Sequence, residues 1–144
     1  MDLIEKMKES HGKDTGHIFV YGTLKVGGYF SKLFDRKRLW SQPATIKGTL
    51  YDVGGIPGLS LEGENIVHGE LHLYKDFSFV IKHMDFIEGY SANRGYMNPY
   101  ARQMAEVETS TGKHSTLLYI VNPILIRQFG KVIESGVWPI GENP

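Results

Sequence analysis

The sequence contains no cysteine among its 144 residues. This absence excludes a thiol nucleophile, a zinc site built on cysteine and a disulfide framework, and it is typical of proteins of the reducing cytoplasm. The formal net charge is zero, because 16 basic residues balance 16 acidic ones. A neutral chain has no bulk attraction for nucleic acid or an anionic membrane, so neither is expected as a partner.

Long apolar runs are missing as well. No stretch approaches the length that spans a bilayer, and the first 16 residues lack the apolar core of a signal peptide. We therefore expect a protein of the cytoplasm. Its length predicts a single domain over residues 17–144, preceded by a tail or short helix over residues 1–16.

Seventeen glycines and eight tyrosines indicate turns and strands rather than a helical bundle. Runs of β-branched and aromatic residues, or alternating polarity, predict strands at 17–21, 44–53, 66–74, 102–109 and 115–121. The Gly- and Pro-rich segment 54–58 is expected to be irregular.

Apolar residues at helical spacing predict a helix over 76–87, with Asp76 as N-cap and Gly89 as the stop. A second short helix is expected near 124–133, after which Trp138 packs back on the body. Together the elements predict an α+β fold, a small mixed, mostly antiparallel β-barrel with a few flanking helices.

Glu88 is the first candidate for chemistry. It follows the apolar helical stretch and precedes a glycine, in MDFIEGY. Partial burial beside aromatic residues would raise the pKa of its carboxyl group toward the range useful for proton transfer. The alternative is an ordinary solvated carboxylate at a helix end, where its charge opposes the helix dipole.

The segment Tyr21-Gly22-Thr23-Leu24 is the second candidate. A glycine directly after a buried strand lets the backbone turn sharply and expose successive N–H groups, which bind carboxylates or oxyanions. A plain turn between strand and loop is the alternative. The loop matches neither the phosphate-binding nor the dinucleotide-binding glycine pattern.

Two further groups of polar side chains are candidates for binding. His68, Glu70 and His72 share one face of a predicted strand and are adequate metal ligands, but alternate residues are about 7 Å apart, which makes one shared ion difficult. Arg94 and Arg102 have the fork geometry for a carboxylate. Several tyrosines are candidates to line a cavity or to pack in the core: Tyr51, Tyr90, Tyr96, Tyr100 and Tyr119.

The order of six segments is more specific than any one of them. FVYGTLK, GTLYDVGGIPGL, VHGELHLY, MDFIEGY, NPYARQMAEVET and STLLYIV together resemble the gamma-glutamylcyclotransferase-like family, from about residue 17 to about residue 121. The YGTLK form is most similar to the branch that acts on gamma-glutamylamines.

The resemblance implies roles for particular residues. The loop Tyr21-Gly22-Thr23-Leu24 is expected to bind the gamma-glutamyl group through its backbone. The family's catalytic glutamate lies in an L-D-x-x-E-G motif, which here reads Met84 to Gly89 and assigns the general acid/base to Glu88. The family's cavity tyrosines match Tyr100 and Tyr119.

The implied reaction is the conversion of a small gamma-glutamyl amine or amino acid into 5-oxoproline and a free amine, with no cofactor and no metal. Two alternatives stay open: a binding module with the same cavity but no turnover, and a metal-dependent hydrolase. The segment 91–98 is long enough to cover or block the mouth of the cavity.

Overall fold

The computed structural model describes residue 5 and residues 14–140. Its strands are β1 (Thr15–Val20), β2 (Arg38–Val53), β3 (Ile56–Lys75), β4 (Tyr100–Thr109), β5 (Gly112–Val121) and β6 (Gly130–Val132). The helices of the described part are α2 (Phe77–Glu88), α3 (Pro123–Phe129) and the 3-10 turns η1 (Ser31–Leu33), η2 (Asp35–Lys37) and η3 (Ala92–Met97). The predicted α+β class is confirmed, whereas the expected tail or helix over 1–16 lies almost entirely outside the described residues.

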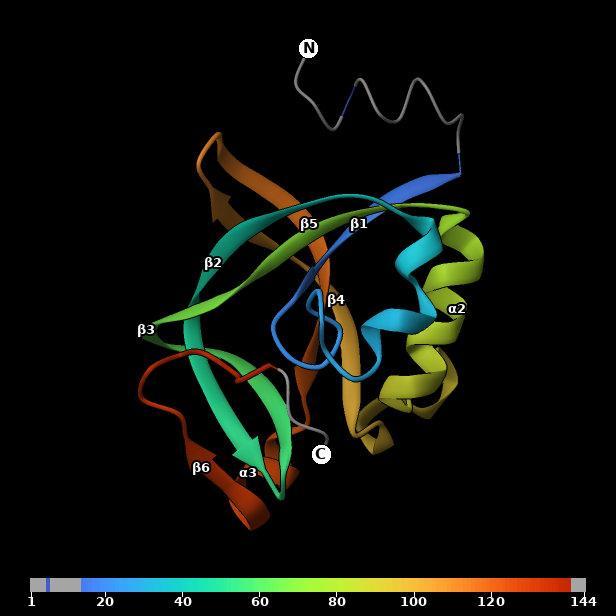
Figure 1. Ribbon diagram of the computed structural model, residues 1–144. Coiled ribbons are helices and arrows are strands. Elements are labelled where there is room, and N and C mark those ends of the chain that lie inside the picture. The colour runs from blue at the N-terminus through green and yellow to red at the C-terminus, as the bar shows by residue number, and fades with distance from the viewer. Residues whose placement is uncertain (1–4, 6–13, 141–144) are drawn as a thin grey trace.

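Five of the strands pair in a ring. The order is β3-β1-β5-β4-β2-β6, and β2 also pairs with β3, so that only β6 lies outside the closed circuit. Every pairing is antiparallel except β1 with β5, which meet in parallel at Ile18 and Leu117. The mostly antiparallel arrangement is therefore confirmed. The loop that follows β1 folds back across the ring between the long β2–β3 ribbon and α2 (Figure 1).

Strands β2 and β3 are much longer than predicted and form one hairpin. The expected irregular segment 54–58 shrinks to the two-residue turn Gly54-Gly55, and Ile56 already pairs with Val53. Both glycines have positive φ, 66° and 99°. A two-residue hairpin turn of this hand requires positive φ at both positions, which glycine adopts without steric cost.

Helix α2 packs its apolar face on the strands, with Val80 and Met84 fully buried. It ends as predicted, because Gly89 takes the left-handed conformation (φ 70°) and its N–H bonds back to the carbonyls of the last turn. Asp76 occupies the N-cap position, but its side chain makes no cap. Its carboxylate instead accepts from Lys37 Nζ at 2.9 Å.

Strand β1 lies at the centre of the core and is buried on both faces. Phe19 belongs to the cluster between β1, β2, β3 and β5, whereas Ile18 and Val20 belong to the cluster under α2. This explains why β1 reads as a continuous apolar run rather than an alternating one. In the described part no helix has the length and apolar character needed to cross a bilayer.

Candidate active site

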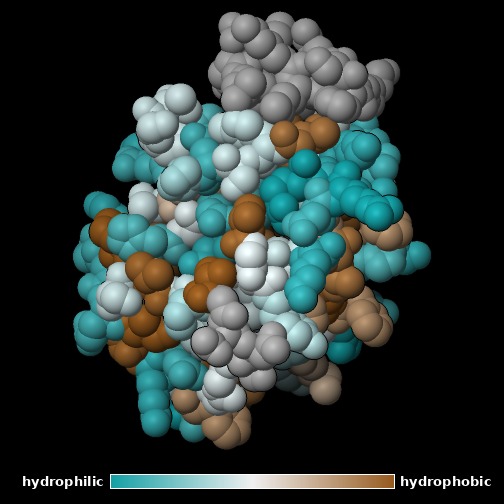
Figure 2. Space-filling view, in the orientation of Figure 1, coloured by the Kyte–Doolittle hydropathy of each residue, from teal (hydrophilic) through white to brown (hydrophobic). Residues whose placement is uncertain are grey.

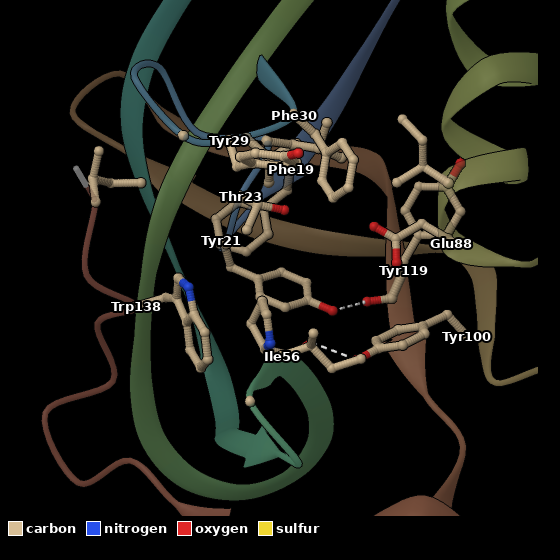
Figure 3. Close-up of a pocket in the computed structure, with 18 of the residues that line it drawn as sticks. Phe19, Tyr21, Thr23, Tyr29, Phe30, Ile56, Glu88, Tyr100, Tyr119 and Trp138 are labelled. Atoms are coloured by element: carbon tan, nitrogen blue, oxygen red, sulfur yellow. Dashed lines mark hydrogen bonds between the residues drawn. The ribbon is translucent and has the colours of Figure 1, made fainter. Parts of the chain in front are cut away.

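A cavity of about 520 Å³ lies between the loop after β1, the end of α2 and the start of β3. The close-up in Figure 3 shows aromatic side chains around it, with Glu88 on one side and Trp138 on the other. The loop after β1, Glu88 and two of the five candidate tyrosines line this cavity: Tyr21, Gly22, Thr23, Leu24, Glu88, Tyr100 and Tyr119. The other candidates do not line it: Tyr51, Tyr90, Tyr96, Arg94 and Arg102. The chemical roles of the lining residues stay predictions.

Glu88 is the last residue of α2, and its carboxyl group points into the cavity (Figure 3). Among the described residues none donates a hydrogen bond to this carboxyl group. Burial raises its pKa, and the negative charge of Asp85 adds to the effect, so that the pKa is about 7. A carboxyl group with this pKa is close to half-ionised at neutral pH, which suits both the uptake and the return of a proton.

Asp85 lies one turn before Glu88 on α2, and the sequence alone predicts no role for it. Its Oδ1 accepts a hydrogen bond from the Tyr119 hydroxyl at 2.6 Å and lies 2.9 Å from Arg102 Nε. The Arg102 N–H does not point along that line, so we treat the second contact as an ion pair rather than a hydrogen bond. The guanidinium also lies over the Tyr90 ring. Arg102 is thus engaged by Asp85 and does not line the cavity.

The tyrosine hydroxyls hold the walls of the cavity in place. Tyr21 donates to the carbonyl of Tyr119 at 2.8 Å and accepts from the N–H of Leu59 at 3.3 Å. Tyr100 donates to the carbonyl of Pro57 at 2.6 Å. Burial and the nearby Glu88 raise the pKa of both Tyr21 and Tyr100, so both phenols stay protonated and continue to donate.

The loop between β1 and η1 offers backbone donors to the cavity. Within the described structure, the N–H groups of Gly22, Thr23 and Leu24 donate to no other group, although all three residues line the cavity. The loop is nevertheless held in shape, because Lys25 N–H bonds to the carbonyl of Gly22 at 3.0 Å and Phe30 N–H to that of Thr23 at 3.1 Å. Successive unpaired N–H groups of this kind bind anions.

The wall opposite Glu88 comes from parts of the chain that the sequence reading did not assign to the site. Trp138, Pro139 and Ile140 line it, as do Tyr29 and Ile56. Tyr29, Ile56 and Ile140 remain 41 to 49% exposed, so they mark the mouth of the cavity. The face shown in Figure 2 carries several separate hydrophobic patches among hydrophilic residues. The segment 91–98 does not line the cavity, so it does not block the mouth.

The residues of the metal hypothesis do not converge. His68 is exposed, whereas His72 is fully buried with Nε2 on Glu70 Oε1 and Nδ1 beside the Tyr74 hydroxyl. Both ring nitrogens of His72 are therefore already engaged by protein groups. Over the described ranges, no three His, Asp or Glu side chains are grouped closely enough to hold a metal ion.

Comparison with protein families gives one match over most of the chain. The model described as "Gamma-glutamyl cyclotransferase, AIG2-like" matches residues 18–139. A protein of Niallia circulans named gamma-L-glutamyl-butirosin B gamma-glutamyl cyclotransferase is 36% identical over 107 residues, which is 74% of this chain and 67% of that protein. A protein of Vibrio cholerae serotype O1 is 30% identical over 122 residues, covering 84% of this chain and 93% of its relative.

Among solved structures, YkqA from Bacillus subtilis superposes with a TM-score of 0.65 at 26% identity. The superposition covers 86% of this chain but only 39% of the length of YkqA. The shared part therefore corresponds to a fraction of that longer protein.

Proposed function

Because this chain belongs to the gamma-glutamyl cyclotransferase, AIG2-like, family, we propose that it converts a gamma-glutamyl amine or gamma-glutamyl amino acid into 5-oxoproline and a free amine. The observation that carries the proposal is the Glu88 carboxyl group, with a pKa of about 7, directed into a cavity that also contains unpaired backbone donors.

In this reaction the α-amino group of the substrate attacks its own γ-carbonyl carbon. A C–N bond forms to close the five-membered ring, and the C–N bond to the leaving amine breaks. The attacking nitrogen arrives as an ammonium and must lose a proton, which ionised Glu88 accepts. Glu88 then returns that proton to the departing nitrogen as the C–N bond breaks. The ring nitrogen still carries one proton more than the lactam, and the same carboxylate transfers this second proton to the released amine, which leaves as an ammonium. Glu88 is therefore ionised again at the end, and no covalent enzyme intermediate is needed.

The N–H groups of Gly22, Thr23 and Leu24 have two uses in this scheme. They bind the carboxylate of the gamma-glutamyl group, or they stabilise the oxyanion that develops on the γ-carbonyl oxygen. Holding the flexible glutamyl chain in a bent shape also brings the amino nitrogen close to the γ-carbonyl carbon. The free substrate would lose conformational entropy to reach this geometry, and in the protein substrate binding offsets that loss. The apolar walls exclude water from the reacting atoms.

The pH dependence follows from the raised pKa of Glu88. Since only the ionised carboxyl group accepts a proton, we expect kcat/KM to rise with pH and to level off above a pKa of about 7. A glutamate with an ordinary pKa would give the same rise in kcat/KM centred near pH 4.5. The pH–rate profile from pH 4.5 to 8.5 measures this limb, and a midpoint below pH 5.5 would contradict the assignment of Glu88 as the base.

The proposed activity is tested with purified protein and a panel of gamma-glutamyl amines and gamma-glutamyl amino acids, including gamma-glutamyl-ε-lysine. We expect enzyme-dependent release of 5-oxoproline, detected by mass spectrometry, from at least one member. If none is turned over while members of the panel raise the melting temperature, the chain is a binding module with the same cavity.

A further inference from the structure

A second set of polar side chains lies behind the loop, outside the cavity. Glu70 Oε1 accepts two hydrogen bonds at 2.8 Å, one from the backbone N–H of Val26 in the loop and one from His72 Nε2. The Glu70 side chain is 26% exposed, and that of His72 is fully buried. Neither residue lines the cavity, and neither has a part in the proposed reaction.

The tautomer of His72 follows from its neighbours. Arg38 Nε lies 3.3 Å from His72 Nδ1, and a guanidinium N–H can only donate. Nδ1 is therefore the acceptor, for Arg38 and for the Tyr74 hydroxyl at 2.8 Å, and the ring proton is on Nε2, directed at Glu70. Burial lowers the pKa of His72, which keeps the imidazole neutral at pH 7 and fixes this direction of donation.

The same polar set reaches the opposite wall through Lys25. This lysine is only 7% exposed, and its Nζ donates to the backbone carbonyl of Trp138 at 2.7 Å. Burial lowers the pKa of Lys25, and the negative charge of the nearby Glu70 opposes that shift. Lys25 thus connects the loop after β1 to the C-terminal segment 138–140, which belongs to no strand or helix.

Burying a lysine and a histidine in this way costs free energy that a simple loop does not require. An apolar side chain would pack behind the loop at lower cost, so the polar set needs another explanation. His72 is held by Arg38 and Tyr74, while Glu70 and Lys25 bond to two segments of the site: the loop that bears the unpaired N–H groups and the wall opposite Glu88.

We propose that Glu70 and Lys25 are positioning residues with separate tasks. Glu70, oriented by His72, fixes the loop that binds the gamma-glutamyl group. Lys25 fixes the wall at 138–140, which reaches the mouth of the cavity at the half-exposed Ile140 and is therefore assigned to the leaving amine. This inference rests on the proposed cyclotransferase function. Glu70 therefore acts on every substrate alike, whereas the contribution of Lys25 grows with the size of the leaving amine.

The experiment compares two substrates, gamma-glutamylmethylamide and gamma-glutamyl-2-phenylethylamide, which share the glutamyl group and differ in the leaving amine. For Glu70→Ala we expect KM to rise about tenfold for both, with a smaller change in kcat, since a charge-assisted hydrogen bond to the loop is lost. Glu70→Gln keeps an oxygen that accepts from Val26, so it should restore KM to within about threefold of native.

For Lys25→Met, which keeps the aliphatic stem, we expect KM to rise about tenfold for the phenylethylamide and less than about threefold for the methylamide. Lys37→Met is the matched control. Lys37 is also a lysine hydrogen-bonded to one oxygen, but that oxygen belongs to Asp76 on the surface, away from the cavity.

Several results would overturn the inference. If Lys25→Met changes KM equally for both substrates, Lys25 has no specific effect on the leaving amine. If KM stays raised in Glu70→Gln as in Glu70→Ala, Glu70 acts only through the general stability of the protein. If the native protein turns over neither these two substrates nor any member of the panel above, the proposed function fails. Amide exchange of residues 22–28 then decides the positioning role: faster exchange at Val26 in Glu70→Ala, restored by Glu70→Gln, supports it, and unchanged exchange refutes it.

Discussion

Replacing Glu88 with glutamine is expected to lower 5-oxoproline release by about a thousandfold at pH 8. Glutamine has nearly the same shape but neither accepts the proton of the attacking ammonium nor returns it to the leaving amine. General acid–base catalysis contributes roughly 10²- to 10⁴-fold in enzymes, and here one group performs both transfers. The measurement is the initial rate of 5-oxoproline formation, by mass spectrometry, at saturating substrate.

The loss cannot be attributed to unfolding, because the substitution is expected to preserve or raise stability. The pKa of Glu88 is about 7 in the folded protein against 4.5 in an unfolded chain. The folded state therefore binds the extra proton between these values, and its stability falls as pH rises from 4.5 to 7. Neutral glutamine has no such cost, so its unfolding midpoint in urea at pH 8 should match or exceed the native one.

A matched control is Glu106→Gln, which removes a carboxylate that is 60% exposed on β4 and outside the cavity. This variant should retain native activity. Substantial turnover by Glu88→Gln, within tenfold of native, would show that another group is the base.

Gly22→Ala is expected to lower kcat/KM by about a hundredfold. A Cβ at position 22 would lie 2.4 Å from Cγ of Pro57, closer than real contacts allow. The proline ring cannot rotate away, and its carbonyl is held by the Tyr100 hydroxyl. The loop must therefore move, and a displacement of about 1 Å in a substrate-positioning group costs about this much in rate.

The Gly22 effect must be separated from lost stability, since overpacking also costs roughly 1–3 kcal/mol. Gly112→Ala serves as the control. Gly112 has φ of 120° in the β4–β5 hairpin, so alanine is strained there, but a Cβ would meet nothing within 4 Å. We expect both variants to unfold at lower urea concentration, and only Gly22→Ala to lose activity in native conditions. Full activity in Gly22→Ala would mean that the loop does not position the substrate.

The parts of the site that were predicted are those set by local sequence. The apolar spacing before Glu88 and the glycine after it predict a helix that ends at this carboxylate, and the structure has that helix end. The Tyr21-Gly22 step likewise predicts a strand that turns into a loop. The family and the fold class were predicted from the order of such segments, and both are confirmed.

The parts that were not predicted depend on distant pairings. Asp85 was overlooked because its partners, Arg102 and Tyr119, come from strands later in the chain. His72 shares a predicted strand face with His68 and Glu70, and nothing in that pattern indicates that it is fully buried. Its ring is in contact with Arg38, which precedes it by 34 residues, and with Tyr74. The wall at Trp138 depends on a carbonyl that accepts from Lys25, and no pattern in the sequence indicates such a contact.

The parallel pairing of β1 with β5 also determines when the cavity can exist during synthesis. Tyr21 and Tyr119 are 98 residues apart in sequence, yet the hydroxyl of one bonds to the carbonyl of the other. A nascent chain leaves the ribosome from its N-terminus, so the loop and Glu88 emerge well before the strand that encloses them. Until β5 emerges, β1 presents an unpaired edge, and closing so long a loop is slow. The chain therefore has no enclosed substrate cavity, and needs protection from edge-to-edge association, until β5 has been synthesised.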